Sequence, residues 1–153
     1  MSITFDELLD SIKRVIKPGL EPRDYLLSSP PVTRPDRIWF VKEPSLDDPL
    51  YRIIEFQPSG IAENEVTRVS VNLARRSYFD FDYPPEGALR KGSFHVRLTP
   101  WLWGEKNPHE DSSWWYVNPP EEFDAKLNDM LAKIIMYGIP FLEDVNSTQT
   151  SWI

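Results

Sequence analysis

The feature that most constrains the fold is a strict alternation of apolar and polar residues in two short stretches. Val69, Val71 and Leu73 alternate with polar residues, and the same pattern recurs over 94–98. Successive side chains of a strand point to opposite faces, so each stretch predicts a strand with one buried and one wet face. This alternation is typical of an antiparallel sheet that is covered on one side only.

A helix is expected near the N-terminus of the chain. Thr4 and Glu7 have the residue types and spacing of a capping box. Apolar residues then recur at helical intervals as far as Ile16, and Pro18 with Gly19 is expected to end the helix.

A second helix is expected near the C-terminal end. Asn118 is a suitable cap residue, and the two prolines and two acids that follow it suit a first helical turn. Apolar residues recur on one face from Phe123 onward, and Gly138 and Pro140 are expected to terminate the helix.

Two further strands are expected over 37–43 and 51–57, which are rich in β-branched and aromatic residues. The proline-rich stretch 20–36 is expected to be an extended connection. The fold class is therefore α+β, an antiparallel sheet of about four to five strands packed on one face by an N-terminal and a C-terminal helix. A length of 153 residues suits one domain, expected over 1–146, with a flexible tail over 147–153.

Composition excludes several classes of protein. Without cysteine there is no disulfide, no thiolate nucleophile and no cysteine-based metal site. The formal net charge of −7 opposes attraction to nucleic acid or anionic lipid, so neither is an expected partner. The six glycines form no phosphate-binding loop, and we expect no cofactor, no metal site and no catalytic residue.

The beginning of the chain has acids where a signal peptide has a basic region, and no later segment is a membrane span. A cytoplasmic location is expected. The sequence does not fix an oligomeric state.

Four segments also resemble a known family in the same order along the chain. These are 51–57, 69–73, the Ser-Trp-Trp run at 113–115 and the ending 137–142. Together they resemble the bacterial domain-of-unknown-function family catalogued under number 4304, over about 39–143. The resemblance implies a small α+β fold and assigns no functional residue.

Aromatic and acidic residues gather in two irregular stretches and form the first candidate binding surface. Trp and Tyr bury large areas with few rotatable bonds, which suits protein contacts. We expect three tryptophans of these stretches (Trp101, Trp114 and Trp115) to close the end of the core. The residues expected at the surface are Asp80, Asp82, Tyr83, Trp103, Glu110 and Asp111.

The polar face of the predicted sheet is the second candidate surface. It carries Arg68, Ser70, Asn72, His95 and Arg97. Two arginines in an acidic protein can hold carboxylates of a partner in bidentate pairs, and the alternative is an ordinary solvated face.

These surfaces favour a noncatalytic protein-interaction module. One version is an immunity-type protein that presents carboxylates to a basic protein partner, because its acidity suits electrostatically steered binding. The alternative is an enzyme, or a protein that binds a small molecule or carbohydrate, with an unfamiliar site around His95 or His109 and a carboxylate.

Overall fold

The computed structural model describes residues 2–30, 35–76 and 94–144 of the chain. Its strands are β1 (Ile3–Thr4), β2 (Leu26–Ser28), β3 (Ile38–Lys42), β4 (Tyr51–Ser59), β5 (Glu65–Val66), β6 (Arg68–Arg76), β7 (Phe94–Arg97) and β8 (Trp115–Tyr116). Its α-helices are α1 (Phe5–Val15), α2 (Lys17–Leu20), α3 (Phe123–Lys133) and α4 (Ile139–Glu143). Four 3-10 turns (Glu21–Arg23, Pro100–Trp103, Glu110–Ser113 and Pro120–Glu122) and a π-helix (Ile134–Gly138) complete the elements of this part.

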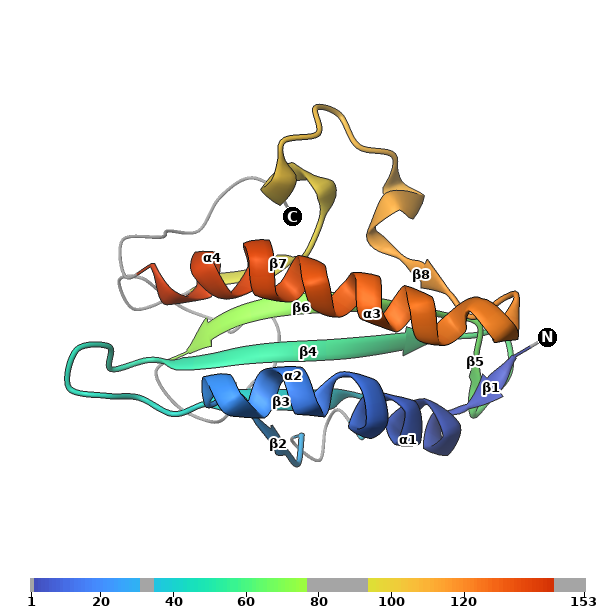
Figure 1. Cartoon of the computed structure of the whole chain (residues 1–153), viewed down its shortest axis with the longest axis horizontal. Helices are drawn as coiled ribbons and strands as arrows, with labels where there is room; N and C mark the ends of the chain where they lie inside the picture. Colours follow the sequence, from blue (N-terminus) through green and yellow to red (C-terminus); the bar gives the residue numbers. More distant parts are fainter. Residues whose placement is uncertain (1, 31–34, 77–93, 145–153) are drawn as a thin grey trace.

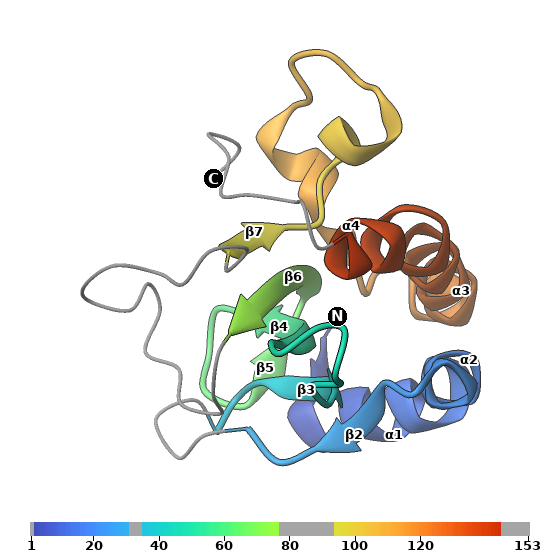
Figure 2. The same cartoon turned by 90° about the vertical axis from the view of Figure 1, so that its left-hand side faces the viewer.

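The main sheet is antiparallel throughout its described strands. Its order is β2-β3-β4-β6-β7, and β8 pairs with the beginning of β6. A separate small ribbon joins β1 to β5. Figure 2 shows the helices gathered on one side of the sheet, which confirms the α+β class and the helical cover on one face. None of the described helices has the length and apolar character needed to cross a membrane.

The N-terminal helix begins as the sequence predicts. The Thr4 hydroxyl accepts a hydrogen bond from the Glu7 amide at 3.1 Å, and the Glu7 carboxylate accepts one from the Thr4 amide at 2.9 Å. Each bond satisfies a backbone donor that has no partner within the helix, so this capping box stabilises the start of α1. Leu8 and Ile12 then bury one face of α1 against the sheet (Figure 1).

The prediction that Pro18 and Gly19 end this helix is wrong in part. The helix does change at Val15, but Pro18 and Gly19 lie within α2, which carries the chain to the buried Leu20. Pro18 lies in the first turn, where its missing N–H costs nothing. A Cβ atom on Gly19 would lie 2.7 Å from a methyl group of Leu131, so this glycine serves the close packing of α2 on α3.

The C-terminal helix begins and ends later than the sequence predicts. A 3-10 turn over Pro120–Glu122 precedes α3, whose cap position is Glu122 and not Asn118. Gly138 does not stop the helical path either, because the chain passes through the π-helix into α4. Pro140 lies in the first turn of α4, where proline is tolerated.

The stretch 20–36 contains more regular structure than expected. Its middle forms β2, an edge strand that pairs with β3. Leu27 packs against the core, whereas Leu26 is 51% exposed. The short length of β2 hid it from the sequence pattern, since three residues are too few to show an alternation.

The apolar face of the sheet is buried as the alternation predicts. Val69, Val71 and Leu73 are fully buried beneath the helices. On the neighbouring strands, the rings of Phe40 and Phe56 meet edge to face with centres 5.8 Å apart. These strands and helices share one hydrophobic core.

The expectation of a wet second face is wrong. Ser70 is 0% exposed and Asn72 is 5% exposed. The Asn72 amide donates to the Glu55 carboxylate at 2.8 Å, and the Trp39 indole N–H donates to the same carboxylate at 2.7 Å. A polar network thus replaces solvent on this face, because a buried carboxylate must be matched by hydrogen-bond donors.

A buried ion cluster lies on the helical face at one end of the sheet. Both guanidinium Nη atoms of Arg75 bind the Asp48 carboxylate, at 2.8 Å and 3.0 Å. Arg52 reaches the same carboxylate at 3.3 Å, and Arg75 also donates to the backbone carbonyl of Leu142. The Asp48 carboxylate therefore links the loop before β4 to β4 and β6, and Arg75 links the cluster to α4.

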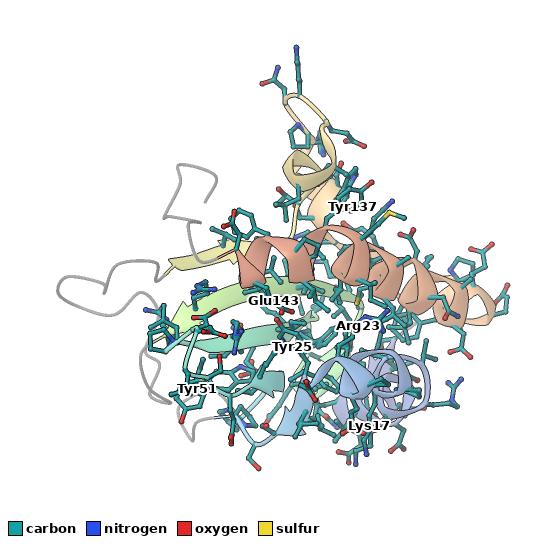
Figure 3. The ribbon with its side chains drawn as sticks, turned by 60° about the vertical axis from the view of Figure 1, so that its left-hand side comes forward. Lys17, Arg23, Tyr25, Tyr51, Tyr137 and Glu143 are labelled. Carbon is teal, nitrogen blue, oxygen red and sulfur yellow. The ribbon has the colours of Figure 1, made fainter. Side chains whose placement is uncertain are left out.

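A second polar contact joins the same end of the fold to α4. The Tyr25 hydroxyl donates to one oxygen of Glu143 at 3.2 Å, and Lys42 binds the other oxygen at 2.8 Å. Tyr25 and Glu143 are labelled in Figure 3. Burial, and then the charge of Glu143, raise the pKa of Tyr25 above its ordinary value.

Asp48→Asn is expected to lower the free energy of unfolding by about 3–5 kcal/mol, because it leaves Arg52 and Arg75 buried without their carboxylate. The neighbouring Asp47→Asn is the control, since Asp47 is exposed, and should stay within about 0.5 kcal/mol of the natural protein. Urea denaturation measures both. Equal stability of the two variants would contradict a supporting role for the cluster.

Stability is expected to fall in alkali partly through Tyr25. The unfolded phenol ionises near pH 10, whereas the folded one keeps its proton. Above that pH the unfolded state binds fewer protons, so this residue lowers the free energy of unfolding by about 1.4 kcal/mol per pH unit. Denaturation between pH 8 and 11 should show a shallower decline for Tyr25→Phe than for the control Tyr116→Phe, whose tyrosine is 41% exposed. Identical declines would refute this assignment.

Candidate interaction surface

One segment stands apart from the sheet and helices. Residues 99–114, here called the arm, leave the sheet after β7 and return at β8, and Figures 1 and 2 show the arm projecting from the body. Backbone hydrogen bonds from Glu105 to Pro100 (3.0 Å) and from Ser112 to His109 (2.9 Å) shape its two turns. Its tip, residues 104–107, is exposed.

The tip needs two left-handed residues to reverse direction. Gly104 has φ 90° and Asn107 has φ 51°. Glycine adopts this conformation freely, and asparagine adopts it more readily than most residues. The sequence therefore encodes the turn locally, without help from the core.

Trp103 anchors the first side of the arm. Its ring lies 5.5 Å from that of Tyr137 on the π-helix, and the Lys133 ammonium group lies 5.1 Å from the Trp103 ring centre. Figure 3 shows Tyr137 at the base of the arm. Trp103, expected to be exposed, is instead partly buried and packs against the core.

Trp114 anchors the second side of the arm. The guanidinium carbons of Arg68 and Arg97 lie 4.0 Å and 5.0 Å from the centre of its ring. Such cation–π contacts each contribute about 0.5–1 kcal/mol at exposed positions. Trp114 therefore packs on the polar face of the sheet. The expectation that it closes the end of the core is wrong.

The position of Trp115 confirms the expectation that this tryptophan closes the end of the core. It is 9% exposed and belongs to the core, and its indole N–H donates to Asp129 on α3 at 3.0 Å. Neighbouring residues of a strand face opposite sides, which separates the two tryptophans. The side chain of Trp101 lies outside the described residues.

Arg97 connects the arm to the polar network of the sheet. Its Nε lies 3.5 Å from the Asn72 side-chain oxygen, and one of its Nη atoms lies 3.4 Å from the Gln57 oxygen. Asn72 also donates to Gln57 at 2.9 Å. The two candidate surfaces that the sequence treats separately therefore meet at Trp114 and Arg97.

The structure places some of the predicted binding residues and not others. Arg68, Arg97 and Trp103 contribute to the arm and its base. The backbones of His95, Glu110 and Asp111 lie in β7 and in an arm turn, but their side chains lie outside the described residues. Asp80, Asp82 and Tyr83, like the predicted tail 147–153, also lie outside the described residues.

Two functional candidates were missed by sequence reasoning. Lys133 and Tyr137 support Trp103, and their spacing of four residues places them on one side of a helix. This four-residue spacing is the one sequence signal that Lys133 and Tyr137 could act together. It does not reveal which residue covers the pair, because Trp103 comes from a segment 30 residues away in the chain.

His109 is exposed on the arm, and in the described part of the chain no three His, Asp or Glu side chains group into a possible metal site.

Outside the arm, the hydrogen bond from Arg14 lowers the pKa of Asp124, and the same bond raises the pKa of Arg14. This pair joins α1 to α3 at 2.6 Å and is not part of the arm.

Comparisons with protein-family models, with curated proteins and with solved structures find no match to this chain. The resemblance to family number 4304 therefore stays a prediction.

Trp114→Leu is expected to loosen the arm without unfolding the protein, because it removes the ring that both arginines contact. Hydrogen exchange of the Glu105 and Ser112 amides should accelerate about five- to thirtyfold, which corresponds to the loss of two cation–π contacts. Trp114→Phe keeps an aromatic face and should exchange nearly as slowly as the natural protein. Unchanged exchange in Trp114→Leu would show that the ring does not hold the arm.

Proposed function

We propose that this protein is a noncatalytic protein-interaction module whose binding surface is the arm. The observation that carries the proposal is an exposed tip mounted on a base held by Trp103 and Trp114. A loop held in one conformation loses little entropy on binding, so more of the contact energy contributes to affinity.

The composition of the arm base supports this function. Tryptophan, tyrosine and arginine are the residues most often responsible for binding energy at protein interfaces. Trp103 meets Tyr137 where the arm leaves the body, and Trp114 meets Arg68 where the arm returns; all four side chains are partly exposed. A partner that seats on the tip and on the first side of the arm would also reach Trp103 and Tyr137.

We propose a basic protein as the partner, and an immunity-type role as one form of this function. The support is the net charge of −7, which attracts a basic partner over long range. A cytoplasmic location and membership of family number 4304 belong to the same proposal. The alternative, an enzyme or a small-molecule or carbohydrate site around His95 or His109, stays a prediction.

Site-specific photocrosslinking tests the surface. A photoreactive amino acid replaces Glu105 at the tip of the arm, and in a second protein it replaces Glu43 in the loop after β3; both glutamates are exposed. In the native cell we expect a defined basic protein to crosslink from position 105 and not from position 43. Mass spectrometry identifies the product.

Trp103→Ala in the crosslinking protein is expected to reduce the yield at least tenfold, because truncation of an interface tryptophan commonly costs 2 kcal/mol or more. Circular dichroism of the variant checks that the fold is retained. The proposal fails if positions 105 and 43 capture the same proteins, or if neither captures any.

A further inference from the structure

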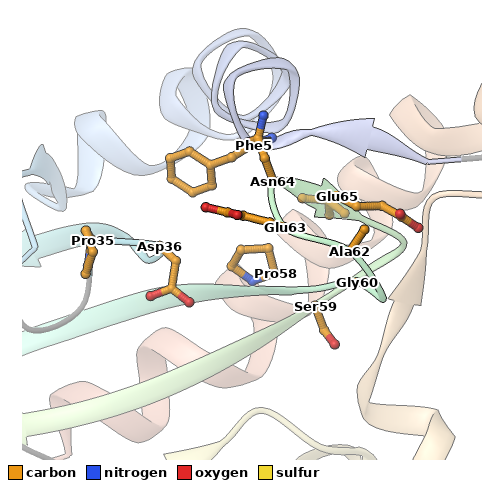
Figure 4. A pocket seen from close by; sticks show the side chains of 11 residues that line it. Phe5, Pro35, Asp36, Pro58, Ser59, Gly60, Ala62, Glu63, Asn64 and Glu65 are labelled. Carbon is orange, nitrogen blue, oxygen red and sulfur yellow. Dashed lines mark hydrogen bonds between the residues drawn. The ribbon is translucent and has the colours of Figure 1, made fainter.

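A cavity of about 500 Å³ lies beside the start of α1. Figure 4 shows the Phe5 ring on one side of it, Pro58 on another, and the carboxylate of Glu63 between them. Asp36 lies across the opening on the β3 side. The volume falls in the range of ordinary ligand sites.

The wall of this cavity is held in place. The Phe5 amide donates to the Asn64 side-chain oxygen at 3.2 Å, which ties loop 60–64 to α1. Asn64 has a left-handed φ of 58°, and a Cβ atom on Gly60 would lie 1.9 Å from the Glu65 carbonyl oxygen. The loop is therefore folded tightly on itself, and the cavity is formed before any ligand binds.

A second cavity of about 280 Å³ continues the first along α1. Phe5 and Pro35 line both cavities, so the two meet at these residues. The second is lined by Leu9 and Lys13 from α1 and by Leu27 from β2. Phe5, Leu9 and Lys13 follow one another at intervals of four, which makes them one stripe of the helix.

The two cavities form one groove whose ends have opposite charge. Glu63 gives the first end its negative charge, because the Asp36 carboxylate beside it is paired with Arg37 at 2.9 Å, and Lys13 gives the other end a positive charge. Glu63 and Lys13 are exposed, and neither forms an ion pair within the part of the chain that the structure describes. Between the charges, Phe5, Leu9 and Leu27 form an apolar wall of the groove.

We propose that this groove binds an extended segment of a protein partner that has a basic side chain, then apolar residues, then an acidic side chain. The Cα atoms of Phe5 and Lys13 are separated by eight residues of helix, or about 12 Å at 1.5 Å per residue. An extended peptide covers that distance in about four residues. The basic residue lies against Phe5 and Glu63, and the acidic residue reaches Lys13.

The groove shares no residue with the arm, so it is a second binding surface with its own partner segment. Failure of the arm experiment leaves this proposal intact, and the reverse also holds.

The probe is the blocked tetrapeptide Arg-Leu-Leu-Glu, titrated into the isotopically labelled full chain and followed by NMR. We expect shifts of the Phe5, Leu9 and Asn64 amides and an affinity roughly fivefold higher than for Arg-Leu-Leu-Arg or Glu-Leu-Leu-Glu, as one exposed charge pair provides. No shifts at these amides, or equal affinity for the three peptides, would overturn the proposal. Equal binding of arginine amide alone would also overturn it, because that ligand has no apolar or acidic part.

Charge reversal at either end should exchange the preferred peptide. Glu63→Lys makes both ends basic and should favour Glu-Leu-Leu-Glu, whereas Lys13→Glu should favour Arg-Leu-Leu-Arg. Glu43→Lys, in the exposed loop after β3, changes the net charge as much as Glu63→Lys and should leave the preference for Arg-Leu-Leu-Glu unchanged. A preference that follows net charge in all three variants would refute a site in the groove.

Discussion

The contact of the Asp48 carboxylate with Arg75 and Arg52 is the constraint on which the arrangement of the helical layer depends. Removing these charges from water is costly, and the cost is offset only if the groups keep their partners in good geometry. Because Arg75 also binds the carbonyl of Leu142, the end of α4 must lie on β6 for the cluster to be complete. The path of the chain through the π-helix brings it there.

On the opposite face of the sheet, a buried carboxylate is again matched by hydrogen-bond donors from neighbouring strands. Glu55 is 1% exposed, and the donors that satisfy it come from Trp39 on β3 and Asn72 on β6. This network fixes the register of three adjacent strands, since a shift by one residue would turn the donors away. Side chains on both faces of the sheet are buried, and the features open to a partner lie at its margins, in the arm and in the groove beside α1.

The sequence predicted what local spacing controls. The capping box of Thr4 and Glu7 and the buried row from Val69 to Leu73 need only neighbouring residues. The sequence-based prediction was wrong where a residue far away in the chain determines whether a side chain is buried. The polarity of Asn72 predicts a position in water, but its partner Glu55 belongs to another strand and buries it.

Gly19 and the residues of the arm show the same limit: the sequence does not reveal which distant residues they contact. The sequence predicts Gly19 to be a helix stop, but the role of this glycine is set by Leu131, more than 100 residues away. At the candidate site, Trp103, Arg68 and Arg97 were named from the sequence. Their connection through Trp114 and Tyr137 could not be, because it exists only once the arm has folded back on β6 and the π-helix.

Native-state hydrogen exchange tests most directly whether the Asp48 cluster joins the sheet and the C-terminal helix into one cooperative unit. We expect the slowest amides of β4, β6 and α4 to open with the same free energy as global unfolding, and the amides of the tip, 104–107, to open at nearly no cost. If α4 opens at a free energy far below that of β4 and β6, the cluster does not hold the helical layer to the sheet.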